Sequence, residues 1–262
     1  MLESRKIGII NGIGLTTLVK REVDRFFKVY LQTIVAPVIT TLLFYTVFAL
    51  AFGGLSRQIG DVPFLEFLAP GLIMMTMVQN AFANTSSSIM ISKVQGNIID
   101  ILMPPISSLE LYLGFIIGAL VRGLVVGIVA GVTMSLFVPL GVESWGIVIA
   151  YAVLGNILLG SLGLAAGIWA EKFDHIAAVT NFIVTPMTFL SGTFYSIRQL
   201  PEFWQGLAHY NPFFYMIDGF RAGFIGHSDG NVLWGIGFLL VIDLLLSALI
   251  LMMLEKGYKL KS

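Results

Sequence analysis

The chain has 262 residues, of which 57% are hydrophobic and only 11% are charged, whereas a soluble domain carries roughly 25% charged residues. Water therefore cannot be its main solvent, and too little polar sequence is left for a separate catalytic domain of ordinary size. The net charge is zero, so the total charge gives no indication of nucleic-acid binding. Cysteine is absent, which excludes disulfides, thiolate metal sites and a cysteine nucleophile. We predict an all-α integral membrane protein in which residues 1–262 form one transmembrane domain.

Residues 15–30 predict an amphipathic helix before the first membrane span. Apolar residues recur at helical spacing, while charged residues occupy the other face. The apolar set is Leu15, Leu18, Val19, Val23, Phe26, Phe27 and Tyr30, and the polar set is Lys20, Arg21, Asp24 and Lys28. The pattern favours a helix lying in the cytoplasmic interface; the alternative is a helix that simply continues into the first span. Because charges interrupt this stretch, a cleavable signal peptide is not expected.

Six apolar runs are long enough to cross a bilayer, which takes about 20 residues. Each is bounded by charge, proline or glycine. The predicted spans are approximately 33–52, 66–91, 109–139, 146–170, 176–195 and 232–254. We find no convincing internal repeat, which weakens the case for a secondary transporter built from inverted repeats.

The distribution of lysine and arginine predicts the orientation of these spans. Eleven basic residues fall on one side: Arg5, Lys6, Lys20, Arg21, Arg25, Lys28, Lys93, Lys172, Lys256, Lys259 and Lys261. Arg57, Arg198 and Arg221 fall on the other side. Six spans with this asymmetry place both termini in the cytoplasm.

The segment SKVQGNIIDILMPPIS, residues 92–107, joins the second and third predicted spans on the cytoplasmic side. It mixes polar with apolar residues and stops at Pro104 and Pro105. This pattern favours a short amphipathic helix that docks on a cytoplasmic partner. A loop helix resting on lipid is the alternative.

Residues 195–231, on the outer side, are too polar to span the membrane, yet they are rich in apolar and aromatic side chains. These are Leu200, Phe203, Trp204, Leu207, Phe213, Phe214, Tyr215, Phe220 and Phe224. We predict re-entrant or interfacial helices that cover the outer mouth. The aromatic residues also fit an ordinary interfacial belt.

Two ionisable residues, Arg122 and Asp243, fall inside predicted spans. Each costs at least about 2.5 kcal/mol when it faces lipid at a helix centre, so each is expected to face protein or water. They are either translocation residues or a buried pair that fixes helix orientation.

The second predicted span carries a polar stripe, and the third carries small residues four apart. The stripe, Gln79, Asn80, Asn84, Ser87 and Ser88, either lines a substrate path or hydrogen-bonds to a neighbouring helix. The small residues, Ala119, Gly123, Gly127 and Gly131, predict close helix packing.

The sequence gives no catalytic or nucleotide-binding motif. The histidines His175, His209 and His227 fall in predicted loops, and neither H-E-x-x-H nor G-x-S-x-G occurs. No G-x-x-x-x-G-K-[ST] loop is present to bind ATP phosphates. We therefore expect no enzyme, no metal site and no cofactor in this chain, and any ATP to be bound by another subunit.

The order of these features resembles the ABC-2 type permeases of bacterial ATP-binding-cassette exporters. The resemblance rests on RFFKVYLQTIVAPVITTLLFY at 25–45, FLAPGLIMM at 67–75, NAFANTSSS at 80–88, and LSGTFYSIRQLPEFWQGLAHYNPFFYMIDGFRAGF at 190–224. The last stretch, with SG-F-x4-LP followed by NP-x2-Y and an arginine, is the most specific. The resemblance covers essentially the whole chain.

The resemblance implies a half-transporter of the bacterial inner membrane: two copies form the pathway, and two ATPase subunits bind ATP and Mg²⁺ beneath them. Residues 92–105 would be the coupling helix and 15–30 the connecting helix. The ATPase contacts expected there are Lys93, Gln95, Asn97 and Asp100.

The same resemblance implies a pathway, an outer gate and a class of cargo. Residues 200–224 would close the exit, with Trp204, Asn211, Pro212, Tyr215 and Arg221 at the gate. Gln79, Asn80, Asn84 and Ser87 are the expected pathway residues. The cargo would be a lipid, a glycan or a drug-like amphiphile. The alternative function is an ATPase-independent channel or secondary carrier that uses Asp243 and Arg122.

Overall fold

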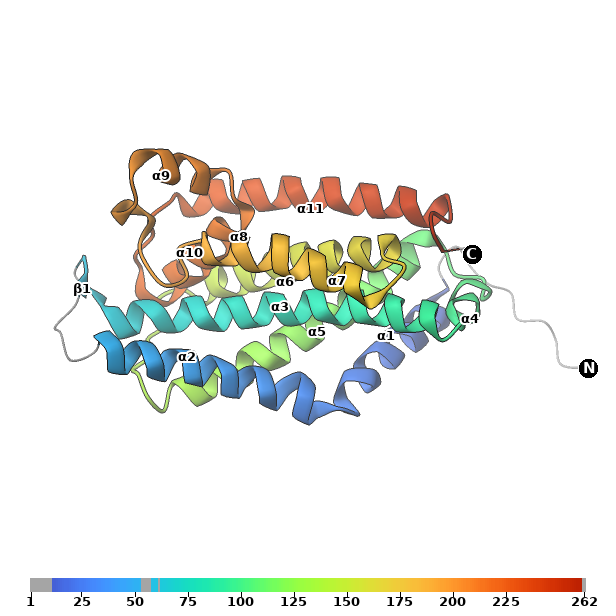
Figure 1. Cartoon of the computed structure of the whole chain (residues 1–262), viewed down its shortest axis with the longest axis horizontal. Helices are drawn as coiled ribbons and strands as arrows, with labels where there is room; N and C mark the ends of the chain where they lie inside the picture. Colours follow the sequence, from blue (N-terminus) through green and yellow to red (C-terminus); the bar gives the residue numbers. More distant parts are fainter. Residues whose placement is uncertain (1–10, 53–57, 61, 261–262) are drawn as a thin grey trace, which may run out of the picture.

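The computed structural model describes residues 11–52, 58–60 and 62–260, which form a bundle of helices along one long axis (Figure 1). Arg5, Lys6, Arg57 and Lys261, which contributed to the predicted orientation, lie outside the described residues. The helices are α1 Gly12–Phe27, η1 Leu31–Val35, α2 Ala36–Phe52, α3 Phe64–Val94, α4 Ile98–Leu102, α5 Ser108–Met134, α6 Trp145–Trp169, α7 Phe173–Val179, η2 Thr180–Val184, α8 Thr185–Phe189, η3 Ile197–Gln199, α9 Glu202–His209, α10 Pro212–Ile225 and α11 Val232–Glu255. Strands β1 Gln58–Ile59 and β2 Val62–Pro63 pair antiparallel at one end.

Five helices in the described part are long and apolar enough to cross a membrane: Leu31–Phe52, Phe64–Val94, Ser108–Met134, Trp145–Trp169 and Val232–Glu255. They confirm the prediction of an all-α membrane protein. Four of them begin and end within a few residues of the predicted runs. The run predicted to end at Pro139 was too long, because α5 stops at Met134 and residues after it turn. Hydropathy does not distinguish an apolar turn from an apolar helix.

The remaining predicted run, 176–195, is a helix in three short pieces. α7, η2 and α8 follow one another without a break and have 7, 5 and 5 residues. This length falls short of a full span, so the sixth crossing stays a prediction. In Figure 1, α7 begins near the end of the bundle that holds α4, and α8 lies towards the end that holds α9.

Helix α3 is the centre of the bundle and packs against α6, α5, α10 and α2. Most of its membrane-spanning window is buried, including several residues of its polar stripe, such as Asn80, Asn84 and Ser88. Glycines permit the closest contacts. A Cβ atom at Gly163 of α6 would overlap the backbone carbonyl of Phe82 and the hydroxyl of Thr85, so these backbones meet because Gly163 has no side chain. Gly123 and Gly127 likewise meet Asn156 and Met77.

We expect Gly163→Val to separate α6 from α3 and to destabilise the protein by about 3 kcal/mol, since a rigid backbone atom blocks the new side chain. The thermal unfolding midpoint in detergent measures this effect. Gly237→Val on α11 is the matched control, because a Cβ there meets no atom within 4 Å. Equal midpoints for the two variants would contradict the packing described.

Helix α1 is separate from the first span. Asn11 caps it by accepting a hydrogen bond from the backbone of Gly14, and Leu18 packs against α5. The chain turns after Phe27, and the Thr33 hydroxyl donates to the Phe26 carbonyl at 2.7 Å. This bond satisfies a carbonyl that the turn leaves without a helical partner. α1 is thus a helix of its own that lies at an angle to α2 in Figure 1, and its position in the cytoplasmic interface stays a prediction.

Candidate functional site

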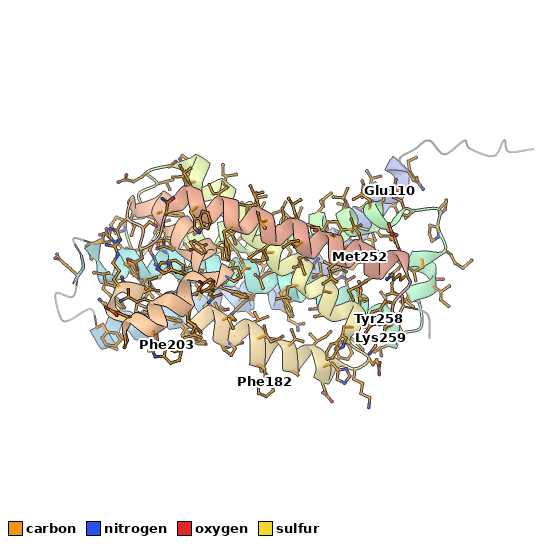
Figure 2. The ribbon with its side chains drawn as sticks, turned by 90° about the horizontal axis from the view of Figure 1, so that it is seen from above. Glu110, Phe182, Phe203, Met252, Tyr258 and Lys259 are labelled. Carbon is orange, nitrogen blue, oxygen red and sulfur yellow. The ribbon has the colours of Figure 1, made fainter. Side chains whose placement is uncertain are left out.

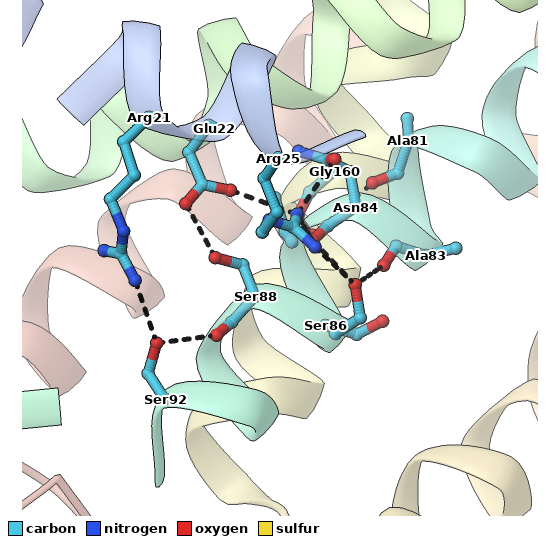
Figure 3. A network of polar contacts seen from close by, with 12 residues as sticks. Arg21, Glu22, Arg25, Ala81, Ala83, Asn84, Ser86, Ser88, Ser92 and Gly160 are labelled. Atoms are coloured by element: carbon cyan, nitrogen blue, oxygen red, sulfur yellow. Dashed lines mark hydrogen bonds and ion pairs between the residues drawn. The ribbon is translucent and has the colours of Figure 1, made fainter. Parts of the chain in front are cut away.

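A buried carboxylate, Glu22, joins α1 to α3 (Figure 3). Its side chain is fully buried. It accepts a hydrogen bond from the Ser88 hydroxyl at 2.7 Å and one from Arg25 at 3.1 Å. This role was not predicted from the sequence, although Glu22 lies four residues from both Leu18 and Phe26 and therefore on the apolar face of the helix.

Arg25 extends the same network along the polar stripe of α3. Its guanidinium donates to the Asn84 carbonyl at 2.7 Å, to the Asn84 side chain at 3.0 Å and to the Ser87 hydroxyl at 3.1 Å. Arg21 donates to Ser92 one turn further on. The part of the stripe from Asn84 onward therefore hydrogen-bonds to a neighbouring helix, which is one of the two predicted roles.

The other part of the stripe lines a groove between the first span and α3, which we call the α2–α3 groove. Its volume is about 320 Å³. Gln79 and Asn80 belong to its lining and lie near the middle of α3. The groove is lined by Gln32, Ala36, Pro37, Thr40, Thr41, Phe44, Leu72, Met75, Thr76, Gln79 and Asn80. Polar and apolar side chains share this surface, as a path for an amphiphile requires.

The two intramembrane charges do not pair. Arg122 donates to the Asn80 side-chain oxygen at 2.9 Å, and both carboxylate oxygens of Asp243 are buried without a hydrogen-bond partner among the described residues. The reason is the packing: α5 presents Arg122 to α3, whereas α11 packs mainly on α6. The proposed Arg122–Asp243 pair is therefore wrong.

At the end of the bundle near the termini, α4 is shorter than predicted. Residues 92–94 continue α3, Gly96 adopts a left-handed conformation with φ of 73°, and only Ile98–Leu102 form the separate helix. Ile98 and Ile101 are buried beneath it, whereas Ile99 and Met103 are exposed. One face of α4 is thus anchored and the other is bare.

The four predicted ATPase contacts divide in the same way. Gln95 and Asp100 are exposed and Asn97 is half-buried. Lys93 instead turns inward, and its ammonium donates to the carbonyls of Ile168 and Ala170. It satisfies carbonyls that the C-terminus of α6 leaves free.

An ion pair joins the turn after α11 to the residues that follow α6. Lys259 donates to Glu171 at 2.7 Å, and Figure 2 places Lys259 and Tyr258 together at this end of the molecule. The hydrogen bond and charge of Lys259 lower the pKa of Glu171, and Glu171 in turn raises the pKa of Lys259. Both groups are therefore charged at neutral pH.

At the opposite end, three of the predicted gate residues build the start of α10. Asn211 caps the helix by accepting from the backbone of Phe213, and its amide donates to the Met187 carbonyl. Pro212 occupies the first turn, where its missing N–H has no cost. Tyr215 is buried, whereas Trp204 on α9 is largely exposed, as is Phe203 at the edge of the molecule in Figure 2.

Arg221, the last predicted gate residue, is buried under α10. It donates to the Phe67 carbonyl at 3.0 Å and to the carbonyls of Gly192 and Thr193 at 2.8 and 3.3 Å. Its guanidinium also lies 3.7 Å from the centre of the Phe67 ring. Arg221 therefore joins α3, α10 and the loop after α8, a role that its place in the sequence motif did not reveal.

A second buried acid that was not predicted from the sequence, Asp218 of α10, binds the turn that follows this helix. Asp218 accepts hydrogen bonds from the Ser228 hydroxyl and from the backbone of Asp229 and Gly230. No periodicity marks it, since its partners lie beyond the helix. In the part of the chain that the structure describes, no three acidic or histidine side chains gather as a metal site would require.

Comparison with known proteins agrees with this architecture. Residues 14–225 match the family model of the ABC-2 type transporter. The chain is 38% identical over 250 residues to the "Inner membrane transport permease YadH" of Escherichia coli K12, covering 95% of this chain and 98% of that protein. It is 30% identical over 106 residues to "Nodulation protein J" of Rhizobium leguminosarum bv. viciae, covering 39% and 40%. The chain therefore belongs to the ABC-2 type transporter family.

Proposed function

We propose that this chain is the membrane half of an ATP-driven exporter of the bacterial inner membrane, working as two copies with two separate ATPase subunits. Family membership and the inner-membrane relatives support this function. ATP binding would close the ATPases and move the helices that touch them. The chain need contribute only different contacts in the two states.

The bare face of α4 is the observation that carries the proposal. A helix of five residues has little stability of its own, yet α4 is fixed from below by Ile98 and Ile101 and presents Ile99, Asp100 and Met103 outward. The exposed fraction of Met103 reaches 76%. Exposed apolar side chains at a helix whose other face is buried suit a contact with a partner protein. We therefore assign the contact with the ATPase to Ile99 and Met103 rather than to Lys93, whose side chain turns inward.

Six crossings with cytoplasmic termini complete the proposed topology. The start of α1, the end of α11 and α4 lie at one end of the bundle in Figure 1, and α9 and β1 lie at the other. Five crossings alone would leave the termini on opposite sides of the membrane. In the proposed topology α7, η2 and α8 together form the sixth crossing. Phe182, which points away from the bundle in Figure 2, gives this segment a membrane-facing side chain.

A second copy would cover the α2–α3 groove. Polar side chains at mid-membrane depth are unfavourable against lipid, and in one copy the groove is open between α2 and α3. Two copies facing each other would turn the groove into a wall of a shared pathway. The cargo suited to such a wall is an amphiphile.

We expect the double change Ile99→Asp and Met103→Asp to abolish co-purification with the ATPase subunit and to remove the coupled ATPase activity. Charged side chains would replace the apolar contact, and truncation or disruption of such an anchor commonly costs at least about 2 kcal/mol of binding. Pull-down from membranes and ATP turnover in proteoliposomes measure the two effects. Phe203→Asp, an equally exposed apolar site at the other end, is the control and should keep both.

An ATPase that remains bound to the double variant would contradict docking at α4. Wild-type protein that transports without any ATPase would instead establish the carrier alternative.

A further inference from the structure

Arg122 is a buried cation without a countercharge. Its side chain is 7% exposed, and its one hydrogen-bond partner is the neutral amide of Asn80. The Nε atom has no partner among the described residues, and no described carboxylate lies within 4.0 Å.

Two other arginines of the bundle, Arg221, which is buried, and Arg25, which is partly exposed, do have carboxylate partners. Arg221 bonds three carbonyls and lies 4.0 Å from Asp218. Arg25 pairs with Glu22 at 3.1 Å. Leaving a buried charge uncompensated is strongly unfavourable. An anion from outside the chain would compensate the charge of Arg122.

Asn80 connects Arg122 to the α2–α3 groove. Its side-chain oxygen accepts from Arg122, its amide nitrogen donates to the Thr76 carbonyl, and both Asn80 and Thr76 line the groove. The side-chain amides of Gln32 and Gln79 also border the groove and have no hydrogen-bond partner among the described residues. The groove therefore offers amide N–H donors that make no hydrogen bond among the described residues, and the buried cation Arg122 lies behind them.

We propose that the α2–α3 groove binds the anionic headgroup of an amphiphile, a carboxylate or a phosphate, with Arg122 as the countercharge behind Asn80. The inference rests on the proposed function, because it assigns a chemical class to the cargo of that pathway. A volume of about 320 Å³ accepts the headgroup and the first carbons of a chain. Phe44, Leu72 and Met75 provide the apolar wall beside them.

A matched pair of fluorescent probes tests the charge requirement directly. Dansyl-undecanoic acid and its methyl ester share one tail and differ in the headgroup charge. We expect the full chain in nonionic detergent to bind the ionised acid about tenfold more tightly than the ester, which corresponds to about 1.4 kcal/mol. Fluorescence titration gives both dissociation constants.

Two variants identify the countercharge. Arg122→Gln should bring the ratio of the two affinities to about one while leaving the ester affinity unchanged. Asn80→Asp places a carboxylate against Arg122, so it should also abolish the preference for the acid while raising the unfolding midpoint. This second variant keeps the test decisive where Arg122→Gln fails to fold. Arg198→Gln, an exposed arginine at the outer end, should keep the tenfold ratio.

Equal affinity of the wild type for acid and ester, or a preference that survives Asn80→Asp, would overturn the inference. ATP-dependent movement of the acid in proteoliposomes would identify the anion as cargo, whereas binding without movement would identify a resident anionic lipid. The titration needs no ATPase subunit. Failure of the anion site is therefore distinguishable from failure of the ATPase to associate.

Discussion

Arg221→Met should destabilise the protein by at least about 3 kcal/mol. The change removes the donors for the carbonyls of Phe67, Gly192 and Thr193, and each buried acceptor left without a partner costs about 1–3 kcal/mol. The thermal unfolding midpoint in detergent measures the loss. Arg221→Lys should be intermediate, because a single ammonium cannot reproduce the geometry of the guanidinium.

Arg198→Met is the matched control for this prediction. The Arg198 side chain is 61% exposed and pairs with Asp229 at 3.4 Å, and exposed pairs contribute about 0–1 kcal/mol. An Arg221→Met protein as stable as the Arg198→Met protein would show that the three carbonyls find other partners, and would contradict the joining role of Arg221.

Glu22→Ala should release α1 from α3 and lower the free energy of unfolding by about 3 kcal/mol. Removing one member of a buried ion pair leaves the other charge without a partner. Here it also removes the hydrogen-bond acceptor of the Ser88 hydroxyl. We expect the low end of the usual range because Arg25 is one quarter exposed. Limited trypsin digestion should then cut at Lys20 and Lys28 faster than in the wild type.

Asp24→Ala on the exposed side of the same helix controls for the loss of an acidic residue. It should leave both the unfolding midpoint and the trypsin sensitivity near the wild-type values. The unfolding midpoint of Glu22→Gln should lie between those of Glu22→Ala and the wild type. Its amide oxygen still accepts from Ser88 but carries no charge to pair with Arg25. Equal effects of Glu22→Ala and Asp24→Ala would mean that the network does not hold α1 in place.

Hydropathy predicted the long helices well because crossing a bilayer imposes length and composition locally. The runs 66–91 and 232–254 correspond closely to α3 and α11. The segment 176–195 shows the limit of this reasoning: its apolar composition suggested a full span, whereas the helix ends at Phe189. Residues 190–195 form turns instead of continuing the helix, and Phe194 stacks on Phe48 of α2.

The candidate site was less accessible to prediction because its contacts join residues far apart in the chain. Arg221 and Phe67 are separated by 154 positions and Lys93 and Ala170 by 77, and no local pattern encodes either contact. Lys93 therefore looked like a docking residue when it is a helix cap. Glu22 could have been found, since its spacing from Leu18 and Phe26 places it on the buried face.

Single-cysteine cross-linking to the ATPase subunit tests the central claim most directly, because the native chain has no cysteine to interfere. Cysteine would be introduced at Met103, directly after α4, and, as a control, at Phe203 on α9. We predict that Met103→Cys cross-links to the ATPase and is protected from an impermeant maleimide added outside, whereas Phe203→Cys is labelled and forms no cross-link. A cross-link from the α9 position, or none from α4 while the ATPase is bound, would contradict it.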